Sequence, residues 1–224
     1  MKIVIVYAHP YAGSFCHGIL EKIKAHIESR GGEVKVKDLA AMNFDCTVRP
    51  EDLLAGKTRQ YTPEVKAEQD DIDWADAVVT IAPVWFGMVP GFLKGYFDKV
   101  LMSGYGYNPA TGDALLRDKR IYSIFTCGMK TPYLELTKQM ECINILWDNM
   151  FGMCGFRDVV TKFYQGVPAV SHETRLAYLE DACNFVDSIF DKQPGEDGQL
   201  AFAELMFKTY GTVSQEYEEL KKYE

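Results

Sequence analysis

The sequence contains neither closely spaced cysteines nor a long apolar segment. Its six cysteines are scattered, with no C-x-x-C pair and no metal-like spacing, so we expect reduced, mostly buried thiols and no bound metal. The longest apolar runs have about six to eight residues, against roughly 18 or more for a membrane-spanning helix. No signal-peptide pattern is present at the N-terminus. The sequence therefore predicts a cytoplasmic protein without membrane insertion.

Positive charge is also scarce. The formal net charge of −8 disfavours nucleic acid and anionic membranes as partners, because both require a basic surface. The sequence contains no G-x-G-x-x-G and no Walker motif, so an ordinary dinucleotide fold and an NTPase both lose support. Any phosphate must therefore be held by a local site.

The chain of 224 residues is 47% hydrophobic and 25% charged, which suits one α/β core and is short for two domains. We expect one domain over residues 1–190. A C-terminal extension, residues 191–224, begins with a linker-like break at 191–198. It is too small to be a domain and is expected to pack on the core or on a second subunit.

Strands and helices alternate along the chain. Helical periodicity or a helix-start signal predicts helices at 14–30, 62–76, 92–101, 134–150 and 171–190. The segment 40–61 resembles a loop. Because parallel neighbours require crossover helices, five such strands predict a parallel sheet in the order 2-1-3-4-5 with helices on both faces. The predicted strands are Ile3–Tyr7, Val34–Leu39, Ala77–Ala82, Ile121–Thr126 and Asp158–Tyr164.

The stretch from Pro83 to Val100 is the most informative part of the sequence. An aromatic loop that contains Val84, Trp85 and Phe86 lies between a buried strand and a helix. The carboxyl ends of parallel strands are where open α/β sheets bind ligands, and these rings offer flat apolar surface to a flat aromatic ligand. The alternative is that Trp85 and Phe86 only cap the core.

Two further loops follow strand ends. In the first, Gly13 allows a tight approach and Ser14 opens a helix, which creates an anion site for phosphate or only an N-cap. In the other, Gly128 would let the backbone approach a ring and Tyr133 could donate its hydroxyl to a developing anion. Alternatively, Tyr133 and Cys127 are packing residues, and His9 is an ordinary turn residue.

These segments resemble the NAD(P)H:quinone oxidoreductases, flavoenzymes of the flavodoxin-like superfamily. The resemblance covers roughly residues 1–190 and is most specific in the loop after the third strand. It is carried by Ala8-His9 with Ser14-Phe15, by 38–44, by Pro83 to Val100, by Tyr105-Gly106-Tyr107 and by Met153-Cys154-Gly155-Phe156.

The resemblance implies a flavin, usually FAD, and a homodimer with pockets at the subunit interface. It assigns the flavin's phosphates and ribityl chain to His9, Ser14, Phe15 and Cys16. It places against the flavin ring Pro83, Val84, Trp85, Phe86, Thr126, Cys127 and Gly128. Tyr133 resembles the active-site tyrosine, Tyr107 and Met153 resemble pocket-wall positions together with Trp85, and Arg175 resembles an arginine near the adenosine half of FAD.

The sequence departs from the family's pattern in two places. The family's active-site histidine falls at Gln139, so a relay of tyrosine and histidine cannot operate in that form. The loop between Leu53 and Pro63 is shorter than in the longest members, which removes a stretch that can touch adenine and keeps FMN open as the alternative cofactor.

The expected function is therefore ping-pong transfer of two electrons, as hydride, from NAD(P)H through flavin to a small-molecule quinone. An azo or nitro reductase would share this chemistry with another acceptor. An electron carrier similar to flavodoxin would use the acidic surface for docking instead, and a flavin-binding regulatory subunit is a third alternative.

Overall fold

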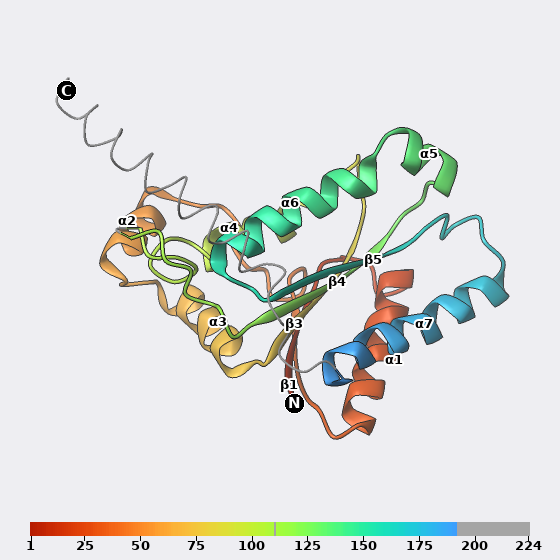
Figure 1. Ribbon diagram of the computed structural model, residues 1–224, viewed down its shortest axis with the longest axis horizontal. Coiled ribbons are helices and arrows are strands. Elements are labelled where there is room, and N and C mark those ends of the chain that lie inside the picture. The colour runs from red at the N-terminus through yellow and green to blue at the C-terminus, as the bar shows by residue number, and fades with distance from the viewer. Residues whose placement is uncertain (110, 192–224) are drawn as a thin grey trace.

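The computed structural model describes residues 1–109 and 111–191, so the expected C-terminal extension lies outside the described residues except for Asp191. Strands and helices alternate as the sequence indicates (Figure 1). The strands are β1 (Lys2–Tyr7), β2 (Glu33–Asp38), β3 (Ala77–Pro83), β4 (Arg120–Thr126) and β5 (Asp158–Tyr164). The helices are α1 (Phe15–Ser29), α2 (Pro50–Thr58), α3 (Pro63–Trp74), α4 (Gly91–Val100), α5 (Thr131–Leu136), α6 (Gln139–Cys154) and α7 (His172–Asp191).

The five strands form one parallel sheet in the order β2-β1-β3-β4-β5, which confirms the predicted topology. The register aligns the carboxyl ends of neighbouring strands: Tyr7 lies opposite Ile81, and Pro83 lies opposite Thr126. The loops that follow β1, β3 and β4 therefore leave from the same edge of the sheet. This is where open α/β sheets bind ligands.

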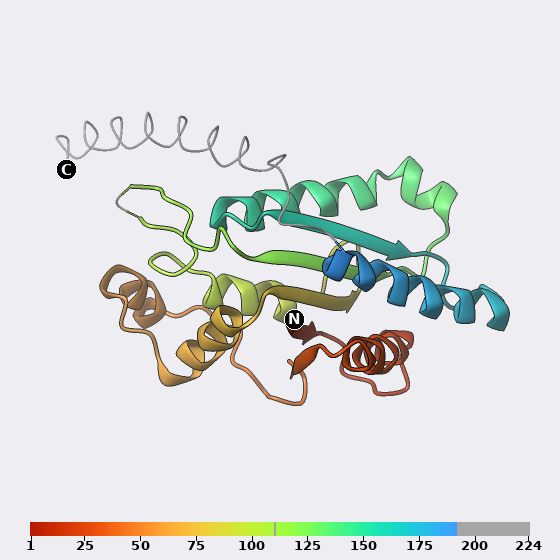
Figure 2. The same cartoon turned by 60° about the horizontal axis from the view of Figure 1, so that its bottom comes forward.

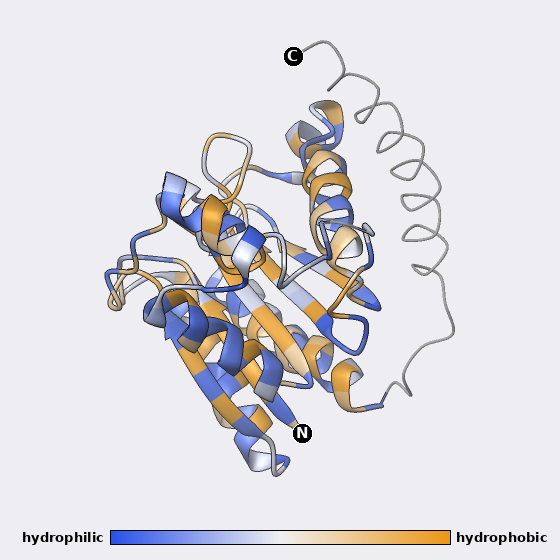
Figure 3. Ribbon diagram, turned by 90° about the vertical axis from the view of Figure 1, so that its left-hand side faces the viewer, coloured by the Kyte–Doolittle hydropathy of each residue, from blue (hydrophilic) through white to orange (hydrophobic). Residues whose placement is uncertain are grey.

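Helices cover both faces of the sheet (Figures 1 and 2). Alternate residues of each strand point to opposite faces, so Val4 and Val6 belong to the core shared with α3, α4 and α6, while Ile3 and Ile5 belong to the core shared with α1 and α7. Apolar residues follow the central strands, and polar residues face outward on the helices (Figure 3). A rigid sheet buried on both faces thus carries the edge loops.

The prediction of a plain loop over 40–61 is wrong, because this segment contains α2. The residues that α2 buries include Asp52, Ala55 and Gly56, so the helix lacks an apolar stripe. A residue of another helix holds α2 in place. The Lys99 ammonium on α4 lies 3.6 Å from the Asp52 carboxylate and donates a hydrogen bond to the Asp45 carbonyl at 3.0 Å. A buried ion pair replaces the apolar contacts that normally dock a helix.

The prediction of one long helix over 134–150 is also wrong. The structure has two helices, α5 and α6, which are separated by Thr137 and Lys138. Lys138 has a φ of 53°, in the left-handed region that non-glycine residues seldom adopt. This break turns the chain between Tyr133 on α5 and Gln139 at the start of α6, so both side chains reach one site.

Candidate functional site

The loop after β1 supplies the N-cap of α1. Ser14 is the N-cap residue, and its hydroxyl accepts a hydrogen bond from the His17 N–H at 3.1 Å. The N–H groups of Phe15 and Cys16 have no backbone or side-chain acceptor elsewhere in residues 1–109 and 111–191. N–H groups exposed in the first turn of a long helix attract anions. The expected N-cap is therefore present beside N–H groups suited to a phosphate.

His9 is held in the same loop. Its Nδ1 accepts a hydrogen bond from the Tyr11 N–H at 3.1 Å, and burial lowers the pKa of His9 below its usual value. Its ring packs edge-on against Trp85, with centroids 5.6 Å apart. The loop after β1 thus contacts the loop after β3.

The loop after β3 is a tight hairpin. The Trp85 N–H donates to the Met88 carbonyl at 2.8 Å, and the Met88 N–H donates back to the Trp85 carbonyl at 3.1 Å. Between them Phe86 and Gly87 both have positive φ, 49° and 85°, as a two-residue hairpin turn requires. Phe86 is fully exposed and Trp85 is 42% exposed. The loop presents aromatic surface instead of burying it.

An aromatic residue with positive φ is strained. The hairpin also leaves the N–H groups of Phe86 and Gly87 without an acceptor among the described residues. Strain, exposed rings and available N–H donors together favour ligand binding over the alternative that the loop only caps the core.

The loop after β4 is hydrogen-bonded to the end of β5. The Cys127 N–H donates to the Tyr164 carbonyl at 2.7 Å, and burial raises the pKa of the Cys127 thiol to about 11. The N–H groups of Gly128 and Met129 have no acceptor within the described part of the chain. A Cβ added to Gly128 would meet no atom within 4 Å. This backbone therefore faces open space.

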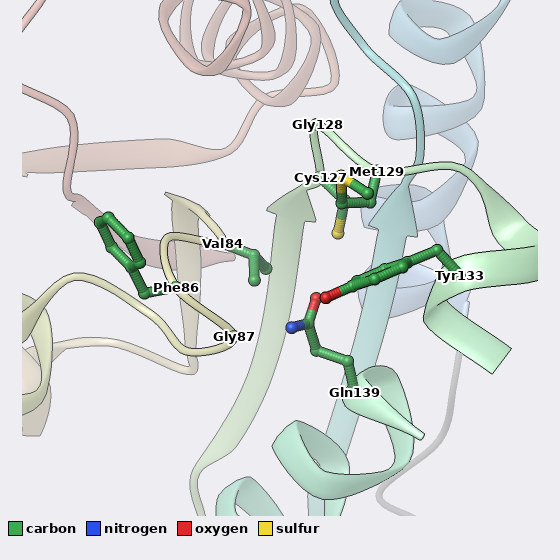
Figure 4. A pocket seen from close by; sticks show the side chains of 8 residues that line it. All are labelled: Val84, Phe86, Gly87, Cys127, Gly128, Met129, Tyr133 and Gln139. Carbon is green, nitrogen blue, oxygen red and sulfur yellow. The ribbon is translucent and has the colours of Figure 1, made fainter. Parts of the chain in front are cut away.

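The loops after β3 and β4 and the start of α6 enclose a pocket of about 370 Å³ (Figure 4). The side chains of Tyr133 and Gln139 point toward one another across one wall, and the Cys127 sulfur points into the cavity. The Gln139 amide nitrogen also lies 3.0 Å from the position that a Cβ on Gly87 would take. The pocket is lined by Val84, Phe86, Gly87, Cys127, Gly128, Met129, Tyr133 and Gln139.

Of the predicted site residues, Val84, Phe86, Cys127, Gly128, Tyr133 and Gln139 line the pocket, whereas Trp85 does not. Pro83 and Thr126 are paired at the ends of β3 and β4, next to the pocket. Arg175, on α7, donates from Nη1 to the carbonyls of Val167 at 3.3 Å and Val170 at 3.1 Å. Its guanidinium therefore supports the turn after β5.

Tyr107 and Met153 do not line this pocket. Met153 lies on α6 14 residues after Gln139, about 21 Å along the helix at 1.5 Å per residue, and Tyr107 pairs with Ala114 in the loop before β4. Sequence reasoning also missed Met129 as a lining residue.

Over residues 1–109 and 111–191, no group of three or more His, Cys, Asp or Glu side chains is arranged to hold a metal ion. In the same residues no helix combines the length and the apolar character needed to cross a membrane.

A family model described as "Flavodoxin-like fold" matches residues 1–186. NAD(P)H dehydrogenase [quinone] 1 of Rattus norvegicus is 28% identical over 245 residues, covering 99% of this chain and 89% of the rat protein. Ribosyldihydronicotinamide dehydrogenase [quinone] of Mus musculus is 28% identical over 217 residues, covering 86% of this chain and 94% of the mouse protein.

Solved structures are similar to this chain as well. NAD(P)H:quinone oxidoreductase from Methanothermobacter marburgensis has 27% identity and a TM-score of 0.73, covering 82% of this chain and 94% of that one. An azoreductase from Bacillus anthracis has 21% identity and a TM-score of 0.62, covering 82% of this chain and 97% of that one. The latter likeness is one of fold alone.

Proposed function

This chain belongs to the family of the flavodoxin-like fold, and from that premise we propose that it is a flavin-dependent NAD(P)H:quinone oxidoreductase. The observation that carries the proposal is the pocket at the ends of β3 and β4, where backbone N–H donors and an aromatic hairpin meet Tyr133 and Gln139. Relatives named as quinone dehydrogenases align over most of the chain. Catalysed quinone reduction by NADPH, lost when flavin is removed, is the direct test.

The described residues fit a flavin. A planar ring requires apolar contact and hydrogen-bond donors at its polar edge. The hairpin offers exposed rings, and the N–H groups of Phe86, Gly87, Gly128 and Met129 are free of acceptors within residues 1–109 and 111–191. We assign ring contacts to Pro83, Val84, Trp85, Phe86, Thr126, Cys127 and Gly128. We assign the ribityl chain and phosphates to His9, Ser14, Phe15 and Cys16.

A bound flavin supplies the redox chemistry, accepting hydride from the reduced donor and passing it to the quinone in a separate half-reaction. The chain supplies position and charge stabilisation. The N–H groups of Gly128 and Met129 offer fixed dipoles to developing negative charge, and they need no reorganisation because β4 and β5 hold their loop. Val84 gives the pocket an apolar lining.

Tyr133 is proposed as the catalytic hydroxyl. It is 45% exposed at the pocket wall, so its hydroxyl can donate a hydrogen bond to a ligand or hold a water. Gln139 faces it across the wall (Figure 4) and can donate or accept a hydrogen bond, but it cannot exchange a proton. Proton delivery therefore falls to the Tyr133 hydroxyl or to a water that it holds.

FAD is the proposed cofactor, with FMN as the alternative. The support is the resemblance at Arg175, which lies beside the turn formed by Val167 and Val170. Chromatography of the flavin released from purified protein distinguishes the two. Recovery of FMN alone would reject the FAD assignment.

A homodimer is proposed as the active form. Because Tyr107 and Met153 lie away from the pocket of their own chain, their pocket-wall role requires a second copy to bring them to it. α6 also exposes Ile145 and Leu146, each about half accessible, an apolar surface suited to a subunit contact. Light scattering that finds a fully active monomer would reject this proposal. The cytoplasmic location stays a prediction.

A further inference from the structure

Tyr133 and Gln139 lie on two helices whose starts have no side-chain cap. In neither helix does the N-cap side chain make a capping hydrogen bond to any described residue. The helix α5 has six residues, of which only Leu134 is buried, and α6 begins directly after the left-handed Lys138. A helix as short as α5 is not stable on its own. Contacts from outside the two helices must therefore fix where Tyr133 and Gln139 lie.

Gln165, the first residue after β5, makes such contacts to both helices. Its Oε1 accepts a hydrogen bond from the Thr131 hydroxyl at 2.5 Å, and its Nε2 donates to the Met140 sulfur at 3.2 Å. Thr131 is the first residue of α5, and Met140 is the second residue of α6, next to Gln139. A carboxamide has one accepting end and one donating end. The Gln165 amide uses both ends and joins the starts of the two helices.

The backbone on either side of Gln165 is hydrogen-bonded to the pocket. The carbonyl of the preceding residue, Tyr164, accepts from the Cys127 N–H at 2.7 Å. The N–H of the following residue, Gly166, donates to the Met129 carbonyl at 2.9 Å. Cys127 and Met129 both line the pocket. The Gln165 amide therefore places α5 and α6 relative to the backbone that is proposed to hold the flavin ring.

Gln165 acts through other residues, because Tyr133 and Gln139 line the pocket and Gln165 does not. Its two hydrogen bonds end two residues before Tyr133, at Thr131, and one residue after Gln139, at Met140. Without these bonds the start of α5 would be free to move relative to α6. A displacement of about 1 Å in a reacting group can cost up to about a hundredfold in rate. A side chain outside the pocket can therefore control the reaction inside it.

We propose that Gln165 is a positioning residue that sets the separation of Tyr133 and Gln139, which point toward one another across the pocket wall (Figure 4). The inference rests on the proposed function, in which the Tyr133 hydroxyl, or a water that it holds, serves the reaction. Because both ends of the amide are used, Thr131 and Met140 share this role. The other reading is that Gln165 only stabilises the fold, and the experiments below separate the two.

The first measurement is hydrogen exchange of the full-length protein, which requires no turnover. Gln165→Met keeps the length of the side chain and removes both hydrogen bonds. The amides of residues 131–142 should then exchange about three- to thirtyfold faster, the scale of one or two lost hydrogen bonds. Gln60→Met is the matched control, because Gln60 is exposed between α2 and α3, and it should leave this exchange unchanged. Exchange that ignores Gln165→Met would overturn the inference.

Substitutions at Thr131 and Met140 test the two ends of the amide separately. Thr131→Val removes the hydroxyl and keeps the branched shape, so it should speed the same exchange. Thr131→Ser keeps the hydroxyl and should behave as the wild type does. Met140→Leu should have a smaller effect than Thr131→Val, because a thioether sulfur is a weak acceptor. Equal exchange in Thr131→Val and Thr131→Ser would show that the bond to Gln165 positions nothing.

Stopped-flow reduction of the bound flavin by NADPH gives a readout that a purely structural role would not produce. Gln165→Met should slow reduction about tenfold and leave flavin content unchanged. In the Tyr133→Phe background the same change should have little effect, because the hydroxyl that it positions is absent. An unchanged rate, equal slowing in both backgrounds or loss of flavin would each overturn the inference. Faster exchange in Gln165→Met, in a protein whose wild type reduces no flavin, would support the link through Gln165 and reject the proposed function.

Discussion

The Cys16 thiol and the Thr126 hydroxyl lie 3.1 Å apart, although 110 residues separate them in the chain. Cys16 is in the first turn of α1, and Thr126 is the last residue of β4. Both are buried. Their contact fixes the proposed phosphate site against the loop that forms the proposed ring site, so the two halves of a flavin would meet a single rigid frame.

The buried thiols should resist alkylation. Burial raises the pKa of Cys16 and of Cys154 to about 12, from an ordinary 9.0, and the thiolate is the reactive form. Cys142 is exposed on α6. Brief treatment of native protein with iodoacetamide at pH 8 should therefore label Cys142 first, as peptide mass spectrometry would show. Labelling of Cys16 at the rate of Cys142 would contradict this account of the α1–β4 contact.

The same thiols predict a loss of stability in alkali. Because their pKa values are raised in the folded state, the unfolded chain loses these protons first, and between about pH 9 and 12 the folded state binds more protons. The free energy of unfolding should therefore be constant with respect to these groups below pH 9 and fall above it, by about 1.4 kcal/mol per pH unit and thiol. Urea titrations of wild type and Cys154→Ala from pH 8 to 10 measure the slope, which should be shallower in the variant.

Tyr133→Phe should slow reduction of the bound flavin by NAD(P)H about ten- to a thousandfold, the scale of losing one hydrogen bond to developing charge. Flavin content should not change, because Tyr133 lies at the proposed ring site and away from the start of α1. Stopped-flow absorbance measures the rate. An unchanged rate would show that Tyr133 is a packing residue.

Gln139→His tests whether the position opposite Tyr133 can take part in proton transfer. The Gln139 side chain already points toward Tyr133 (Figure 4), so an imidazole there should raise the reduction rate of the wild type. In the Tyr133→Phe background the same change should have little effect, because the relay requires both groups. Equal gains in the two backgrounds would argue against coupling between the two positions.

The sequence was sufficient for the sheet. β3 is a mostly apolar run that is buried at every residue, and β5, although partly polar and only partly buried, spans Asp158–Tyr164 as predicted. The loops of the candidate site could be predicted because they come directly after the carboxyl ends of the strands. The helix α2 was missed because the residues it buries include Asp52 and Gly56 and form no apolar stripe, although Pro50 at its first position is a helix-start signal. The break before α6 occurs at Lys138 without a glycine or proline signal. The contact that holds α2, from Lys99 to Asp52, is a long-range one.

The ion pair that anchors α2 should be costly to break. Asp52→Asn keeps an acceptor for the Arg49 N–H, which Asp52 accepts at 2.8 Å, but it leaves the Lys99 ammonium buried without its carboxylate. We expect a loss of about 2–4 kcal/mol in the free energy of unfolding, measured with urea. Asp70→Asn, which removes the exposed partner of Lys66, is the control and should cost less than about 0.5 kcal/mol. Equal effects would contradict a specific role for the buried pair.

Phe86→Gly should separate stability from binding. Phe86 has a φ of 49° and is fully exposed, so glycine relieves about 1–2 kcal/mol of left-handed strain while about 0.5–1 kcal/mol of chain entropy opposes the gain. The flavin-free protein should melt higher by about 1–3 °C. Flavin affinity, measured by fluorescence quenching, should fall about tenfold because an aromatic contact is lost. Phe86→Ala removes the ring and keeps the strain, so it should lower affinity without raising the melting temperature. A Phe86→Gly protein that binds flavin as tightly as wild type would show that this ring lies outside the flavin site.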